Sequence, residues 1–253
     1  MIVVIWNPSI RKSVSIVIPN VLPYSRYGYT LIGFGVCPDD TSHPKLVKIN
    51  VNKIKIPYTW VVEVCTLSTR VWKTVYMGAP FKSCDLMWDP VYIDGIIYCH
   101  TVRFDERLWS NYIISFDLKR EKFGEVSLSE RLARAYDLVV AKVNESLCFL
   151  EYYNEGETSV CGVWTKKDGI NKPFTKIYTV KVEGKSVLLG FRNNGEVVLE
   201  MEDDNDKGYA VEVYKPSSGD INGDGINGKY GGFSAVSYME TLLLLHESYS
   251  IIH

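Results

Sequence analysis

The chain has 253 residues, of which 46% are hydrophobic, so it can bury a sizeable core as one large domain or two small ones. Its 30 acidic and 28 basic side chains give a formal net charge of −2. That balance argues against nucleic acid or an anionic membrane as the main partner, because both favour basic surfaces.

Alternating apolar and polar runs predict short β-strands along the whole chain. Residues 2–6 and 13–18 form a first hairpin, and a last hairpin is expected at 235–238 and 242–245. Four units lie between them. The first three have strands at 29–34, 45–51, 60–65 and 71–76; at 91–93, 96–102, 112–118 and 122–128; and at 138–143, 147–152, 160–165 and 174–180. Residues 129–136 predict one helical turn with Ser129 as its N-cap.

The fourth unit is incomplete in this interpretation. Strands are expected at 187–191, 197–201 and 209–214, but the fourth strand has no clear place. Residues 218–232 hold six glycines, which are poor strand formers.

Repetition is the main signal for the fold. Matching hairpin positions recur at separations of 59, 51, 48 and 50 residues: Trp6, Cys65, Phe116, Trp164 and Tyr214. A second series, Ile97, Leu147 and Val197, recurs every 50 residues. A period near 50 with two hairpins per repeat is typical of a kelch-type propeller blade. We therefore predict a single all-β domain over residues 1–253, a kelch-like β-propeller of about five four-stranded blades. Pairing of the N- and C-terminal strands would close the last blade and remove exposed sheet edges.

Several motifs occur in a fixed order: WNPSIRK from residue 6, IGFG from 32, KLVKI from 45, IDGIIY from 93, ISFDL from 114 and SYMETL from 237. In this order and spacing the chain resembles the F-box-associated domain of plant F-box proteins over nearly its whole length. The resemblance implies a propeller that selects a target protein for a cullin-based (SCF) ubiquitin ligase. In that family a separate F-box docks the ligase adaptor. This chain contains no F-box, so we expect it to join the adaptor only if an F-box is supplied upstream.

Partner-binding residues are expected at one end of the propeller, where the second-to-third strand loops and the connections between blades meet. These loops are residues 53–55, 103–109, 152–155 and 203–206. They contain aromatic and arginine side chains, which often anchor protein interfaces, together with an acidic run. The candidates are Arg103, Phe104, Arg107, Trp109, Tyr153, Asp203 and Asp204. The alternative is that these are ordinary solvated loops.

No catalytic residue, cofactor or metal is predicted. The four histidines are scattered, and no nucleophile elbow, zinc spacing or phosphate loop occurs. Residues 220–227 match the opening of a calcium loop, but position twelve is Gly231 in place of the bidentate glutamate, which favours a flexible loop without an ion. Trp6, Trp72 and Trp164 are expected to pack between blades.

The six cysteines include no Cys-x-x-Cys pair, and four of them, Cys65, Cys99, Cys148 and Cys161, fall inside predicted strands. Buried, reduced thiols indicate a reducing compartment. The apolar N-terminal run is too short for a signal peptide, and no run reaches membrane-spanning length. We therefore expect a cytoplasmic or nuclear protein that binds an unknown target protein and neither nucleic acid nor a membrane.

Two other functions remain open. One is a truncated or degenerate propeller that has lost its ligase role, and the other is a propeller that binds a sugar or another small ligand. An enzyme would need convergent acids or histidines at the inner ends of the strands, and the sequence has no such set in phase with the repeats.

Overall fold

The computed structural model describes residues 1–54, 58–78, 84–87, 90–105, 108–143, 145–156, 158–166, 173–183, 186–192, 194–203 and 208–233. Only the backbone is described for some of these residues: 40–42, 84, 85, 104, 105, 108, 182, 183, 203 and 224. The chain divides into two compact units, whose described residues lie within 1–134 (unit 1) and 135–233 (unit 2). Two expectations stay predictions: that the whole chain forms one domain, and that residues 235–245 pair with the N-terminal hairpin. Residues 235–245 lie outside the described ranges.

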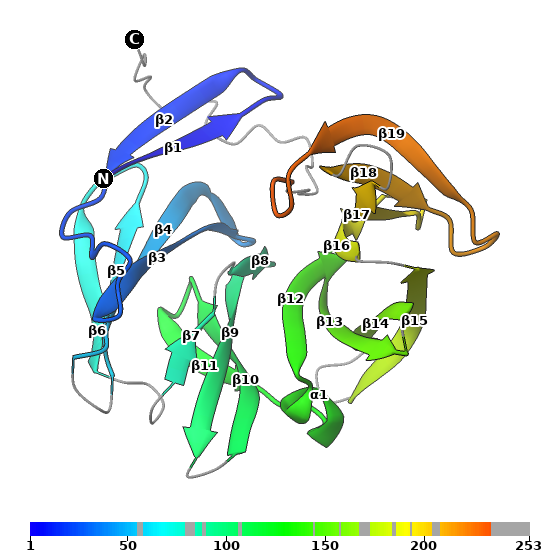
Figure 1. Ribbon diagram of the computed structural model, residues 1–253. Helices are drawn as coiled ribbons and strands as arrows, with labels where there is room; N and C mark the ends of the chain where they lie inside the picture. Colours follow the sequence, from blue (N-terminus) through cyan, green and yellow to red (C-terminus); the bar gives the residue numbers. More distant parts are fainter. Residues whose placement is uncertain are drawn as a thin grey trace. The chain divides into compact units, whose positions relative to one another are not determined.

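Unit 1 contains three antiparallel sheets (Figure 1). The first pairs β1 (Ile2–Asn7) with β2 (Lys12–Val17). The second has the order β3-β4-β5-β6, with bounds Gly28–Cys37, Asp40–Asn52, Thr59–Thr66 and Trp72–Gly78. The third has the order β11-β10-β9-β7, with β8 also paired to β9; these strands are β7 (Cys84–Leu86), β8 (Val91–Ile93), β9 (Ile96–Asp105), β10 (Leu108–Asp117) and β11 (Lys122–Val126).

The predicted helical turn is confirmed as α1 (Glu130–Arg134), which follows β11. The Ser129 hydroxyl accepts a hydrogen bond from the Leu132 amide at 3.5 Å, so Ser129 is the N-cap. Within the described ranges, no helix is long and apolar enough to cross a membrane.

Unit 2 contains two four-stranded antiparallel sheets, each paired in chain order. The first comprises β12 (Asp137–Val143), β13 (Ser146–Glu155), β14 (Thr158–Lys166) and β15 (Phe174–Glu183). The second comprises β16 (Ser186–Phe191), β17 (Val197–Asp203), β18 (Gly208–Tyr214) and β19 (Ile221–Gly228). The predicted all-β fold with repeated four-stranded antiparallel sheets is therefore confirmed, while the sheet of β7 to β11 has a fifth strand, β7, that the sequence did not predict.

The repeated sequence positions mark a repeated turn. A hairpin turn follows each of the repeated residues Trp6, Cys65, Phe116 and Tyr214. The residue five positions after each of them has a positive φ: Arg11 at 53°, Arg70 at 56°, Glu121 at 53° and Gly219 at 79°. In the last three turns that residue donates its amide to the carbonyl four residues before it, at 2.8–2.9 Å. The turn after Phe116 is also capped by Asp117 Oδ1, which accepts from the amides of Lys119 and Arg120. A common local geometry thus explains the common spacing.

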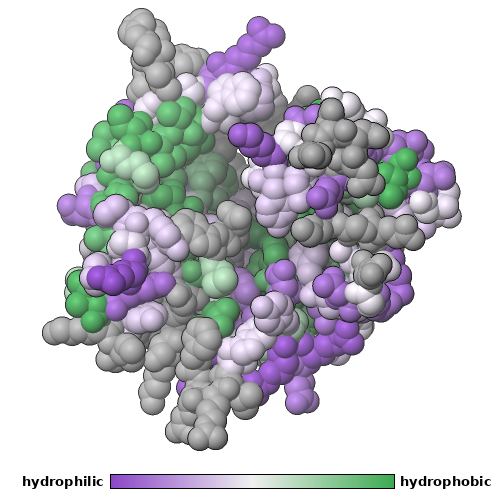
Figure 2. Space-filling view, viewed as in Figure 1, coloured by the Kyte–Doolittle hydropathy of each residue, from purple (hydrophilic) through white to green (hydrophobic). Residues whose placement is uncertain are grey.

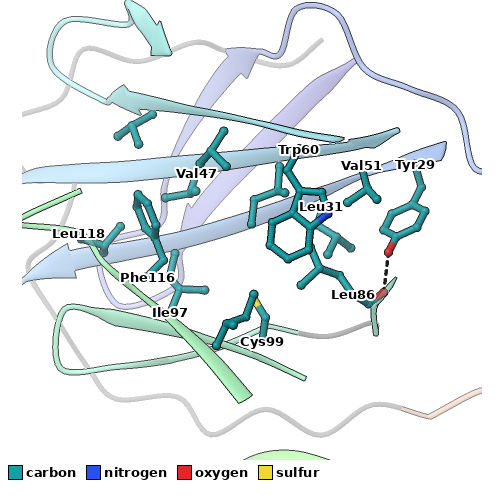
Figure 3. Packing of buried hydrophobic residues seen from close by; sticks show 14 of the residues in the cluster. Tyr29, Leu31, Val47, Val51, Trp60, Leu86, Ile97, Cys99, Phe116 and Leu118 are labelled. Carbon is teal, nitrogen blue, oxygen red and sulfur yellow. Dashed lines mark hydrogen bonds between the residues drawn. The ribbon is translucent and has the colours of Figure 1, made fainter. Parts of the chain in front are cut away.

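The main core of unit 1 lies between the β3–β6 sheet and the sheet of β7 to β11 (Figure 3). Trp60 and Phe116 are fully buried there, and Phe123 packs edge-on against both rings, 6.0 and 5.1 Å away between centroids. Gly35 of the IGFG motif allows close packing, because an added Cβ would meet the Tyr92 ring at 2.4 Å.

A smaller core joins the β1–β2 hairpin to the β3–β6 sheet. Hydrophobic side chains gather over this part of the molecule at the upper left of Figure 2. Trp72 packs here as predicted and donates Nε1 to the Val17 carbonyl at 3.0 Å. Trp6, in contrast, is 65% exposed, because Val3 and Ile5 face this core from β1 and Trp6 lies on the strand's other face.

The core of unit 2 packs β13 to β15 against β16 and β17. Tyr152 crosses this core: its hydroxyl accepts from the Leu188 amide at 3.2 Å and donates to the Leu188 carbonyl at 3.4 Å. Burial raises the pKa of this phenol far above its ordinary value of 10.0. The hydroxyl therefore stays protonated and links the two sheets.

The glycine-rich segment corrects two predictions. Residues 218–232 contain β19, the strand that the sequence could not place, so the segment expected to be a flexible loop is a strand. The strand pairs with β18 from Ile221 opposite Tyr214 to Gly228 opposite Tyr209. A bulge lies opposite Val211 and Glu212. Ladder pairing uses backbone groups, which glycine supplies, so low strand propensity was overridden by the neighbouring strand. A calcium loop coils its oxygens around one point, whereas a strand directs successive side chains to opposite faces. Absence of a bound metal stays a prediction.

Candidate functional site

The predicted partner-binding loops all follow the second strand of their sheets. The hairpins β4–β5, β9–β10, β13–β14 and β17–β18 occur where the sequence placed these loops. Arg103, Trp109 and Tyr153, however, lie inside β9, β10 and β13 and not in the connecting turns. Arg107 and Asp204 lie outside the described residues, and Phe104 and Asp203 are described by their backbone alone, at the ends of β9 and β17. Their role in partner binding, and the meeting of loops from the two units, stay predictions.

Arg103 and Trp109 lie on opposite faces of their sheet. Arg103 pairs with Ser110 across the β9–β10 ladder, while Trp109 pairs with Phe104. Because neighbouring residues of a strand point to opposite faces, the two predicted anchors do not form one cluster. Both are half-buried, and the Trp109 carbonyl accepts a hydrogen bond from Arg134 at 3.0 Å.

Tyr153 belongs to a cluster on one face of the β12–β15 sheet. Lys176 Nζ donates to the Tyr153 hydroxyl at 3.2 Å and lies 5.2 Å from the Tyr153 ring centroid and 5.3 Å from that of Trp164. Trp164 Nε1 donates to Glu151 Oε2 at 3.0 Å. Tyr153 therefore holds a lysine of its own unit, a contact that the sequence did not predict.

A further group of exposed and half-buried side chains lies at the loop end of unit 1. None of them is among the seven candidates, although Lys53 and Ile54 lie in a loop that the sequence placed at this end. It is formed by the β2–β3 connection and by the residues between β4 and β5. We call it the tyrosine–cation surface: Tyr24, Arg26, Tyr27, Lys53, Ile54 and Tyr58. Tyr24 is 71% exposed, Tyr27 54% and Ile54 67%.

A tight turn presents Arg26 and Tyr27. Ser25 donates its amide to the Gly28 carbonyl at 2.9 Å, and its hydroxyl accepts from the Tyr27 amide at 3.2 Å. The Tyr27 carbonyl in turn accepts from the Lys53 amide at 2.9 Å, so the turn is bonded to the end of β4. Gly28 is required by this approach, because an added Cβ would lie 2.5 Å from the Val51 carbonyl oxygen.

The first half of the β2–β3 connection is also bonded to the sheet. The Leu22 amide donates to Thr30 Oγ1 at 2.7 Å, and Asn50 Nδ2 donates to the Asn20 carbonyl at 2.8 Å. Thr30 and Asn50 are themselves hydrogen-bonded, at 2.6 Å. The β2–β3 connection is therefore anchored to the sheet by hydrogen bonds, and its side chains are held in place before any partner binds.

A buried lysine fixes the point where the connection leaves β2. The Lys48 ammonium donates to the Pro19 carbonyl at 2.7 Å, lies 2.5 Å from Glu63 Oε2, and lies 5.4 Å from the Trp72 ring centroid. Its side chain is fully buried. A buried charge of this kind is tolerated because it is both paired and hydrogen-bonded.

Within the tyrosine–cation surface, cations lie over aromatic rings. Lys53 Nζ is 4.8 Å from the Tyr29 ring centroid and 5.8 Å from that of Tyr58, and the Tyr24 and Tyr29 rings are 6.2 Å apart. The Arg26 guanidinium lies 4.7 Å from the Tyr27 ring and donates to its hydroxyl. Such contacts orient the rings and the charges together. Tyr29 itself is buried, and its hydroxyl donates to the Leu86 carbonyl (Figure 3).

At the opposite end of unit 1, the β10–β11 turn is joined to the neighbouring sheet by ion pairs. Glu121 accepts hydrogen bonds from Lys45 at 3.0 Å and from Lys73 at 3.3 Å. Burial opposes ionisation of Glu121, but the hydrogen bonds and charges of the two lysines outweigh it, so the pKa of Glu121 falls below its ordinary 4.5. Lys119 of the same turn pairs with Asp39. These charges link one sheet to the next.

The thiols of the described residues have the character of core side chains. Cys37, Cys65, Cys99, Cys148 and Cys161 are buried and free. Burial raises the pKa of Cys99 and of Cys161 to about 12. At neutral pH such thiols are protonated and poor nucleophiles. No group of three or more His, Cys, Asp or Glu side chains with metal-binding geometry occurs in the described part of the chain.

A small cavity within unit 2 is lined by Tyr152, Cys161, Leu188 and neighbouring residues. Its volume is about 10 Å³, room for about one water molecule. Sites for small organic ligands are typically about 300–1,000 Å³, so this cavity holds no such ligand.

Comparison with known sequences identifies the family of this chain. A family sequence model described as the F-box associated beta propeller domain matches residues 2–237. The Arabidopsis thaliana protein "F-box only protein 12" is 28% identical over 153 residues, which cover 55% of this chain and 36% of that protein. The match thus spans about a third of the length of this relative.

Two solved glycoside hydrolases share some of the backbone arrangement. A family 117 enzyme of Zobellia galactanivorans has a TM-score of 0.44 and 10% identity, covering 89% of this chain and 75% of its own. An enzyme of Bacteroides ovatus has a TM-score of 0.40 and 9% identity, covering 85% and 73%. Likenesses this distant carry no argument about activity.

Proposed function

Because the chain belongs to the family of F-box associated β-propeller domains, we propose that it is a non-enzymatic domain that selects a target protein for a cullin-based ubiquitin ligase. Family membership and the F-box relative support a protein-interaction role. The structural observation that carries the proposal is the tyrosine–cation surface. Tyrosine and arginine side chains supply much of the energy of protein interfaces, and rigid strands hold the loops that carry them.

The chemistry of the buried polar groups supports a binding role over a catalytic one. The buried carboxylates Glu151 and Glu200 are hydrogen-bonded to Trp164 and to the Gly231 amide, the latter at 2.6 Å. The Cys99 and Cys161 thiols are protonated at neutral pH. These groups stabilise the sheets and present no activated nucleophile or base.

In this proposal the ligase adaptor binds an F-box, and this domain binds the target protein. The site of action is the cytoplasm or the nucleus. The target meets the loop end of the domain, where the predicted residues Arg103 and Trp109 and the tyrosine–cation surface both occur.

The test is a fusion of the full chain to the F-box of a plant F-box protein, expressed in plant cells beside the same F-box without the chain. We expect a reproducible set of proteins that co-purify with the fusion and gain ubiquitin only when the chain is present. Equal sets from both samples would contradict the proposal. Binding to a glycan array by the purified chain, with no protein target, would favour the sugar-binding alternative, and binding to neither would favour a degenerate propeller.

A further inference from the structure

The tyrosine–cation surface has a one-sided charge. Residues 19–31 and 50–62, which form it, contain Arg26, Lys53 and Lys55 and no Asp or Glu. At the chain's average of 30 acidic residues in 253, these 26 residues would hold about three. The nearest carboxylate in sequence, Glu63, is paired with the buried Lys48. A surface whose own segments carry cations and no carboxylate, on a chain of net charge −2, attracts an anionic partner.

The same surface is rich in exposed rings and is held by backbone hydrogen bonds. Tyr24 and Tyr27 are exposed at the two sides of the turn that carries Arg26, and Ile54 adds an exposed apolar side chain beside Lys53. The turn and the end of β4 are joined through Tyr27 and Lys53. Rings and cations on one rigid support suit an extended segment that combines carboxylates with apolar side chains.

We propose that the tyrosine–cation surface binds an acidic peptide segment of the target protein, with Asp or Glu side chains meeting Arg26 and Lys53 and apolar side chains packing on Tyr24, Tyr27 and Ile54. This deepens the proposed function, on which it rests for the identity of the partner as a protein. None of its residues is among the seven candidates named from the sequence, although Lys53 and Ile54 lie in a loop predicted for the same end.

The experiment uses the purified full chain and a displayed library of random 12-residue peptides. Wild-type protein is expected to select peptides enriched in Asp and Glu. The variant Arg26→Glu/Lys53→Glu should lose at least about tenfold in affinity for those peptides and select peptides rich in Lys and Arg, because its surface charge is reversed. The matched control, Lys119→Glu/Lys122→Glu at the opposite turn, changes net charge equally and should retain both the affinity and the acidic preference.

Two further measurements separate charge from folding. Thermal unfolding of each variant should stay close to wild type, since Arg26, Lys119 and Lys122 are exposed and Lys53 is half-buried. Affinity of wild type for a selected acidic peptide should fall as ionic strength rises from about 0.01 to about 1 M, where the screening length shrinks from about 30 to about 3 Å. Replacement of the peptide's Asp and Glu by Asn and Gln should abolish the difference between wild type and the Arg26→Glu/Lys53→Glu variant.

Three results would overturn the proposal: no peptide selected by wild type, selected peptides without acidic enrichment, or equal loss in the Lys119→Glu/Lys122→Glu control. The F-box fusion experiment distinguishes this failure from failure of the proposed function. If the chain still directs ubiquitin to its targets while any of these results holds, the function stands and the acidic-peptide surface is wrong.

Discussion

The buried Lys48–Glu63 pair gives the sharpest test of how unit 1 holds its loops. In Lys48→Met, a side chain of similar length keeps the packing against Trp72 but removes the charge and both contacts of the ammonium. Glu63, 15% exposed, is left as a largely buried carboxylate without its cation, and the Pro19 carbonyl loses its donor. Removing one member of a buried pair costs about 3–5 kcal/mol, and the partial exposure of Glu63 places the loss near about 3 kcal/mol.

The loss of unfolding free energy is measured by urea unfolding followed by tryptophan fluorescence. In a separate thermal scan, the melting temperature is expected to fall by about 6–12 °C for a chain of this size. The double variant Lys48→Met/Glu63→Leu should regain more than half of the lost free energy, because no unpaired charge remains. Lys119→Met, which removes an exposed pair with Asp39, should leave the unfolding midpoint unchanged. A loss below about 1 kcal/mol in Lys48→Met, or a double variant no more stable than the single one, would refute this reasoning.

Three other predictions follow from the same structure. Gly28→Ala should cost about 1–3 kcal/mol in urea unfolding and weaken binding of the selected acidic peptide, because its Cβ cannot fit 2.5 Å from the Val51 carbonyl oxygen; unchanged stability and binding would contradict this. Since Glu121 has a lowered pKa in the folded state, its stabilising contribution is present above about pH 4.5 and is lost as the pH falls through the lowered pKa. Unfolding midpoints of Glu121→Gln should therefore decline less steeply than wild type below that pH, and parallel curves would count against the ion pairs. Iodoacetamide should label Cys99 and Cys161 slowly in the folded chain and rapidly in urea, as read by peptide mass spectrometry; fast labelling of the folded protein would show that these thiols are not protonated core side chains.

Repetition in the sequence was a reliable guide to the strands. The series Trp6, Cys65, Phe116 and Tyr214 could be aligned because each residue precedes a turn with the same left-handed closing residue. Spacing of this kind is local, so it is visible without knowledge of the rest of the fold. The strands of the first three units therefore agree with the predicted ranges to within a few residues at their ends.

The strand β19 could not be predicted in the same way. Its segment combines glycines, aspartates and asparagines, which locally favour turns. What makes it a strand is the ladder with β18 and the packing of Phe233 against Gly228, where an added Cβ would lie 2.8 Å from the ring. The ladder depends on β18, a strand outside the glycine-rich segment, so the composition of that segment alone does not reveal it.

Whether the candidate residues bind a partner stays a prediction. The second-to-third strand hairpins occur where the sequence placed them, but Arg103, Trp109 and Tyr153 lie inside strands. Arg103 and Trp109 face opposite sides of their sheet, and Lys176 donates to Tyr153. The tyrosine–cation surface joins segments about 25 residues apart through the Tyr27–Lys53 hydrogen bond, a contact that periodicity does not reveal. A sequence signal did exist: three tyrosines and an arginine in residues 19–31, with no acidic residue in that segment or in 50–62.

The central claim, that the target protein meets the loop end of the domain, is tested most directly by hydrogen–deuterium exchange of the full chain with and without a target from the F-box fusion experiment. The account predicts slower exchange on binding at residues 20–28 and 52–54, with no change at the opposite turn, residues 117–122. Protection of residues 117–122 with unchanged exchange at the loop end would contradict it.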